Sequence, residues 1–260
     1  MDLLRPGLHV VRRDDRHLQI GLDPPWRVVV PDEPDVQAVL DDLAAGRAPS
    51  PATHAGHRAL RELRTAGMLV PATSPPRSGR VAVVGDARPA TEVVRLLRAA
   101  DVVPVPADRA DGADLAVVVA AGEPPRDLVD DRVRAGQPHL VVGAGPRGYR
   151  VGPFVAPGAT ACLRCVDAHL AELDPRRGVV VEQLAGRPAA PDDPVLESLA
   201  AGWAVRDMIR YLAGATPSTW SASVDLDVDL DPQRRSWSRH PHCGCAWDAL
   251  APTDRAVSGE

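Results

Sequence analysis

Four cysteines, the only ones in this 260-residue chain, form two close pairs that lie far apart in the sequence. Cys162 and Cys165 make a CxxC motif, and Cys243 and Cys245 make a CxC motif. Two chelating pairs of thiolates can surround a tetrahedral ion, and the ion that most often takes such ligands is zinc. The alternatives are two disulfides or ordinary buried thiols, but neither explains why every cysteine lies in a pair.

A zinc ion held by four sulfur atoms has no open position for water, so this ligand set predicts a structural site and not a catalytic one. Such an ion would tie the start of the last third of the chain to its C-terminal end. A CxxC motif alone can also be a redox centre, but nothing around Cys162 resembles the thioredoxin pattern. His240 and His242 lie nearby, and because four sulfurs complete the site, we expect both histidines outside it.

The composition, with 45% apolar and 25% charged residues, is that of an ordinary soluble globular protein. No run of about 18 apolar residues and no signal-peptide profile occurs, which predicts a cytoplasmic protein without a membrane segment. The net charge of -5 gives no general reason to bind nucleic acid or an anionic membrane. All 30 cationic residues are arginine, which excludes a P-loop lysine or a lysine Schiff base.

The first 71 residues predict a small winged-helix-like α+β module. Three short apolar-rich runs read as an antiparallel meander, namely Leu8–Arg13, His17–Leu22 and Trp26–Val30. A helix should begin at Pro34, because Val36, Val39, Leu40 and Leu43 repeat at helical spacing. A second helix from about Thr53 should turn Leu60 and Leu63 inward, and residues 68–70 should add a closing strand.

A module of this kind can bind either DNA or a peptide. DNA binding is disfavoured because residues 1–79 hold ten arginines and ten acidic residues, which leaves no positive field for phosphates. Peptide capture is the competing use: an extended peptide would add a strand beside Val28, Val29 and Val30, facing the helix that carries Leu60, Arg61 and Arg64. The alternative is that residues 28–30 are simply core, which alternation suggests for at least Val29.

Residues 72–79 are rich in proline and serine and mark the boundary between this module and a second domain, residues 80–260. From residue 80 onward, apolar strands alternate with helices, which predicts a Rossmann-like domain whose parallel sheet is covered on both faces. Between the cysteine pairs we expect a mobile loop that includes one helical turn over residues 176–194, a long helix at 194–213, and an exposed-edge strand at 220–228.

The nucleotide motif of such a domain is degraded here. A GxGxxG loop lets phosphates approach backbone N–H groups at a helix start, but residues 85–90 read Gly-Asp-Ala-Arg-Pro-Ala and keep only the first glycine. Asp86 places negative charge where pyrophosphate would lie, and Pro89 removes a backbone donor. We therefore do not expect bound ATP.

Two stretches carry a family resemblance: VGPFVAPGATACLRCVDAH at residues 151–169 and RHPHCGCAW at residues 239–247. They resemble the ThiF/ubiquitin-activating-like proteins of azole-forming peptide (TOMM, RiPP) clusters, in particular the actinobacterial leader-peptide-binding partners of YcaO cyclodehydratases. The resemblance implies a winged-helix peptide-recognition module followed by an adenylating-enzyme-like domain with a four-cysteine zinc. It assigns the four cysteines as zinc ligands and implies homodimerisation.

The departures from that family are as informative as the matches. Active members of the broader family place an aspartate on magnesium after a later strand, where this chain has Ala120 and Ala121. The resemblance and these departures together imply a protein that is not an enzyme, recognises a precursor leader peptide, and presents that peptide to a YcaO-type cyclodehydratase. The alternative is an ATP-dependent adenylyltransferase acting on a peptide or carrier-protein carboxylate.

Overall fold

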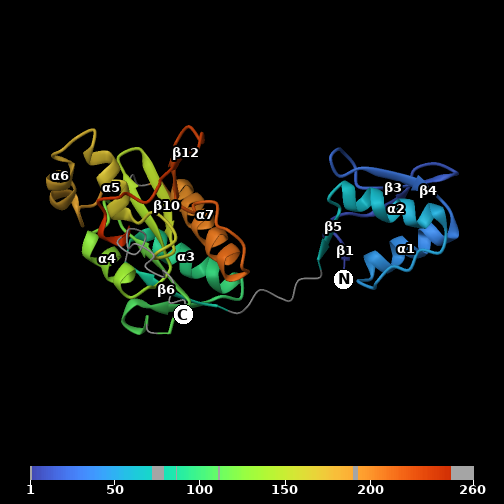
Figure 1. Cartoon of the computed structure of the whole chain (residues 1–260), viewed down its shortest axis with the longest axis horizontal. Helices are drawn as coiled ribbons and strands as arrows, with labels where there is room; N and C mark the ends of the chain where they lie inside the picture. Colours follow the sequence, from blue (N-terminus) through green and yellow to red (C-terminus); the bar gives the residue numbers. More distant parts are fainter. Residues whose placement is uncertain (1, 72–78, 86, 111, 190–192, 247–260) are drawn as a thin grey trace, which may run out of the picture. The chain divides into compact units, whose positions relative to one another are not determined.

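The structure is a computed structural model that describes residues 2–71, 79–85, 87–110, 112–189 and 193–246. The chain divides into two compact units, residues 1–75 and 76–260 (Figure 1). The predicted linker, apart from Gly79, lies outside the described residues, as do Asp86 and Trp247. No helix of the described part is both long and apolar enough to cross a membrane.

The N-terminal unit contains the predicted meander. Strands β2 (Val10–Arg12), β3 (His17–Ile20) and β4 (Val28–Pro31) form an antiparallel sheet in the order β2-β3-β4, so that β4 is an edge strand. Helices α1 (Pro34–Ala44) and α2 (His54–Thr65) follow as expected. The closing strand β5 (Leu69–Pro71) pairs with β1 (Asp2–Leu4), a strand that was not predicted from the sequence.

The core of this unit lies between the three-stranded sheet and the two helices. The predicted stripe on α1 is fully buried, and Leu60 and Leu63 of α2 point inward as expected. The inward position suggested for Val29 is wrong: Val29 is 38% exposed, whereas Val28 and Val30 are 8% and 2% exposed. The register explains this, because Val28 and Val30 pair with the buried Ile20 and Leu18 and share their face of the sheet.

The second unit is built on a seven-stranded sheet in the order β12-β11-β10-β9-β8-β6-β7. Neighbours from β7 through β6 and β8 to β9 run parallel, and neighbours from β9 to β12 run antiparallel. The strands are β6 (Arg80–Val84), β7 (Val103–Pro106), β8 (Leu115–Val119), β9 (His139–Gly145), β10 (Gly148–Val155), β11 (Ala222–Asp227) and β12 (Gln233–Ser236).

Helices cover both faces of this sheet (Figure 1). Helices α3 (Arg88–Ala99) and α7 (Pro194–Leu212) pack on one face and form the larger core with side chains such as Val117 and Phe154. Helices α4 (Arg126–Arg134) and α5 (Leu163–Ala171) pack on the other face around Val141. Two short 3-10 turns, η1 (Ala107–Arg109) and η2 (Gly244–Ala246), complete the described elements.

Two expectations for the region between the cysteine pairs are wrong. The segment predicted as a loop contains helix α6 (Arg177–Leu184), whose buried residue is Val181. The apolar run from Val179 supports this helix, although glycine and proline flank it. In addition, β11 is not an edge strand, because β12 pairs with its outer side.

The turn after β6 should tolerate no side chain. Gly85 has a φ of +106°, and a Cβ there would lie 2.0 Å from the carbonyl oxygen of Val119. Gly136 also has a positive φ (+64°) but has nothing within 4 Å of its would-be Cβ. We expect Gly136→Ala to lower the free energy of unfolding by about 1–2 kcal/mol, and Gly85→Ala to lower it by a further ~1–3 kcal/mol or more.

Chemical denaturation of the two variants, followed by circular dichroism, measures this difference. Equal destabilisation by both substitutions would show that the close approach between the turn and β8 does not constrain the domain.

Candidate metal centre and peptide groove

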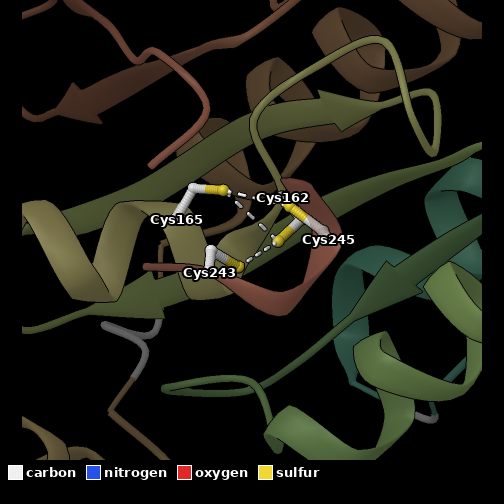
Figure 2. A group of neighbouring side chains, drawn as sticks. All are labelled: Cys162, Cys165, Cys243 and Cys245. Carbon is white, nitrogen blue, oxygen red and sulfur yellow. Dashed lines mark hydrogen bonds between the residues drawn. The ribbon is translucent and has the colours of Figure 1, made fainter. Parts of the chain in front are cut away.

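The two cysteine pairs come together at the N-terminus of α5. Cys162 is the N-cap residue of this helix and Cys165 lies in its first turn, so a three-residue spacing places both on one side of the turn. Cys243 and Cys245 arrive from the chain that follows β12, and Cys245 lies in η2. Figure 2 shows the four side chains converging from these two segments.

The sulfur positions fit a tetrahedral ion. Three Sγ–Sγ distances are 3.7 Å (Cys162–Cys165), 3.6 Å (Cys162–Cys243) and 3.3 Å (Cys165–Cys245). Zinc with Zn–S bonds of about 2.3 Å requires tetrahedral sulfur separations of about 3.8 Å. All four cysteines are free thiols in the structure, and three of them are buried. The two-disulfide alternative is therefore not realised, and the ligand set suits zinc.

Electrostatics also favour a cation at this position. The hydrogen bond with Cys165, followed by burial, raises the pKa of Cys162 far above its usual range, while the same bond lowers the pKa of Cys165 to about 4. Burial raises the pKa of Cys245 to about 12. The buried thiols therefore share their protons and cannot all ionise together. A bound zinc ion would replace those protons and allow four thiolates to gather.

The histidines near the cysteines lie outside the sulfur cluster, as expected. The buried His240 accepts the backbone N–H of His242 at Nδ1 (3.2 Å), so its Nε2 donates to Glu172 (3.0 Å). His169 places its Nε2 3.0 Å from the carbonyl oxygen of Ser238. Arg239 donates to the carbonyl oxygens of Gly158 and Cys245. These contacts fasten the chain after β12 to α5 and position the second cysteine pair.

At the sites where a Rossmann fold would bind phosphates, this chain makes contacts with itself. Arg88, in the first turn of α3, lies 3.2 Å from the carboxylate of Glu197 on α7, and the Tyr149 hydroxyl donates to that carboxylate at 3.4 Å. Burial, followed by the charge of Glu197, raises the pKa of Tyr149 to about 12, so this phenol stays protonated.

A segment of the chain also covers the carboxyl end of β8. The N–H of Ala189 donates to the carbonyl oxygen of Ala121 (2.8 Å), and the N–H of Gly186 donates to that of Glu123 (3.2 Å). Gly122 lies so close to this segment that a Cβ would be 1.9 Å from the carbonyl oxygen of Arg187. Ligands of open α/β sheets bind at the carboxyl ends of the strands, and here residues 185–189 lie across one of them.

A groove of about 710 Å³ lies between β4 and α2 in the N-terminal unit. It is lined by Arg27, Val28, Val29, Arg58, Arg61, Glu62, Thr65 and Ala66. Of the residues expected in a peptide clamp, Val28, Val29 and Arg61 line it.

Three other residues of the expected clamp lie elsewhere. Val30 and Leu60 are buried in the core, and Arg64 forms an ion pair with Asp2 at 3.1 Å. The groove also contains Arg58, Glu62 and Thr65, which were not predicted, although their spacing of four and three residues places them on one helical face.

The outer edge of β4 has backbone groups available for another strand. The N–H of Asp32 donates to the carbonyl oxygen of Arg16 at 2.8 Å, so these two residues form a hydrogen-bonded pair of the antiparallel β3–β4 ladder. Hydrogen-bonded and non-hydrogen-bonded pairs alternate along such a ladder. Val28 and Val30 therefore bond to β3, and the N–H and C=O of Val29 point to the free edge. Pro31 has no N–H to offer, so the available donors lie at Val29 and toward Arg27.

No protein-family model and no curated protein matches this sequence. Solved structures do. The heterocyclase TruD is 17% identical with a TM-score of 0.68, and the match covers 94% of this chain and 42% of TruD. The microcin C7 biosynthetic enzyme MccB in complex with N-formylated MccA is 14% identical with a TM-score of 0.60, covering 94% of this chain and 99% of MccB.

E. coli MccB with AMPCPP and MccA is 13% identical with a TM-score of 0.61, and the match covers 94% and 99% of the two chains. This chain therefore spans less than half of TruD but nearly the whole of MccB. At these identities the likeness shows the fold alone. It confirms the predicted fold class, a Rossmann-like α/β domain of the MccB type with four clustered cysteines and a small N-terminal α+β module.

Proposed function

We propose that this chain is a non-catalytic recognition protein that captures the leader of a ribosomally made precursor peptide in the groove between β4 and α2. The observation that carries the proposal is the free edge of β4, where the N–H and C=O of Val29 face outward beside the groove. A peptide that adds a strand there gains main-chain hydrogen bonds, and the groove receives its alternate side chains. The MccB structures, which hold MccA on the same fold, support a peptide ligand.

The captured peptide would then be presented to a separate modifying enzyme of the YcaO cyclodehydratase type. The match with TruD supports this step, because 42% of that heterocyclase has the fold of this chain. Holding the leader next to such an enzyme converts a bimolecular encounter into a nearly intramolecular one, which raises the effective concentration of substrate.

The four cysteines would hold a structural zinc ion in this scaffold. All four ligands would be sulfur, which leaves no position for water or substrate. The ion would therefore supply folding free energy to the second unit and no catalytic chemistry, and the chain's own residues would fix the two pairs in place through α5 and Arg239.

ATP-dependent adenylyl transfer to a peptide or carrier-protein carboxylate is the rival function. The MccB structure with AMPCPP favours it, because that fold can hold a nucleotide analogue. Against it stand the missing glycines after Gly85, the absence of lysine, the contact of Arg88 with Glu197, and residues 185–189 across the end of β8. These features support a scaffold that recognises its substrate without activating it.

Peptide capture depends on a backbone donor at residue 29. Val29→Pro removes the outward N–H but none of the hydrogen bonds to β3, whereas Val29→Ala keeps the donor. We expect Val29→Pro to weaken leader binding by about tenfold, the loss of one hydrogen bond. We expect Val29→Ala to bind within about threefold of the wild type.

Titration with a synthetic leader peptide encoded beside this chain, followed by fluorescence anisotropy, measures both variants. No binding by the wild type at high micromolar concentration would count against peptide capture. Equal binding by both variants would place the peptide elsewhere on the protein.

Metal content tests the cysteine centre. We expect about one zinc ion per purified chain by elemental mass spectrometry, and far less in Cys243→Ser, because three sulfurs and one hydroxyl bind zinc weakly. Arg164→Ala changes the exposed residue inside the CxxC motif and should keep the full zinc content. A wild-type protein without stoichiometric metal would refute the zinc proposal.

The rival function predicts exchange of radiolabelled pyrophosphate into ATP in the presence of the peptide. We expect no exchange above the background of a sample without protein, since the groups that would bind the phosphates are missing or engaged. Exchange that requires both ATP and the peptide would establish the adenylyltransferase instead.

A further inference from the structure

The groove between β4 and α2 is more positive than the unit that contains it. Residues 1–79 are balanced in charge, yet the groove holds Arg27, Arg58 and Arg61 against Glu62. Arg58 donates to Glu62 at 2.8 Å, so that acidic residue is already engaged. Among the described residues, the side chains of Arg27 and Arg61 have neither an ion-pair nor a hydrogen-bond partner. Two guanidinium groups are thus available to a ligand.

Strand addition decides which ligand side chains reach these arginines. A peptide residue opposite Val29 would point its side chain to the solvent face, as Val29 does. The residues on either side of it would point to the face of Val28, where α2 packs. Two side chains, spaced two residues apart, would therefore face Arg58 and Arg61.

The lining of the groove suits glutamate at those two positions. Val28 and Ala66 offer apolar surface against which the methylene groups of a glutamate can lie, and Arg61 can take its carboxylate in a charge-assisted hydrogen bond. Arg27 precedes β4 and sits where the peptide would continue past Val29, so a further acidic residue there would have a partner.

We propose that the segment captured at β4 is acidic, with carboxylate side chains at alternate positions that face α2 and pair with Arg61, and a further carboxylate near Arg27. The inference rests on the proposed capture of a peptide in this groove and names the chemistry of the part that is captured. Because Pro31 offers no donor, the paired segment extends from Val29 toward Arg27 and not in the other direction.

Selection of random twelve-residue peptides on the immobilised full chain tests this proposal. We expect the wild type to enrich peptides with glutamate or aspartate at alternate positions, and the double variant Arg27→Glu/Arg61→Glu to lose those peptides and enrich basic ones. Arg64→Gln, a change on the same helix but outside the groove, should enrich the same acidic peptides as the wild type. All three positions are exposed, and circular dichroism checks that the variants remain folded.

A selected peptide and its Glu→Gln counterpart give the quantitative measure. We expect the Gln peptide to bind about tenfold more weakly at low salt, with the difference shrinking at high salt as screening weakens exposed ion pairs. If the selected peptides bind the wild type but not Val29→Pro, and are not enriched in acidic residues, the acidic class is overturned and peptide capture still holds. Failure to select any peptide that depends on β4 would overturn both.

Discussion

The second unit depends on the contact between two cysteine pairs that lie about eighty residues apart in sequence, Cys162–Cys165 and Cys243–Cys245. A thiolate cluster is repulsive without a cation, so this contact exists as a low-energy arrangement only if the sulfurs share protons or hold a metal. The hydrogen bonds of Arg239 and His240 bring the second pair to the first. They position the ligands, and the ion proposed for the cluster would hold them together.

The same unit keeps the architecture of a nucleotide-type fold although its own residues contact the start of α3 and cover the end of β8. Gly85 still makes the close turn against Val119, because the packing of β6 on β8 requires it whether or not phosphates bind. Arg88 contacts the internal carboxylate of Glu197, and residues 185–189 hydrogen-bond across the end of β8. The glycine that remains is explained by backbone geometry, and so its presence says nothing about a ligand.

The features that could be predicted from sequence were those fixed by local pattern: the cysteine pairs, the apolar stripe of α1, and the strands that alternate with helices. What failed depended on partners distant in sequence. The face of Val29 follows from its pairing with Gln19, and the ion pair of Arg64 with Asp2 requires the unpredicted strand β1. The register of a strand and the partner of a long cationic side chain depend on the tertiary structure, so the periodicity of the sequence alone does not predict them.

The edge of β4 also has to avoid pairing with another copy of itself. An exposed edge strand that carries Val29 invites association, and folded proteins commonly guard such edges with charge. Arg27 and Arg61 would do this, because two copies approaching edge to edge would bring like charges together. An acidic peptide meets attraction at the same place. The charge that would recruit the proposed ligand therefore also protects the strand while it is empty, so one pair of arginines can serve both solubility and selectivity.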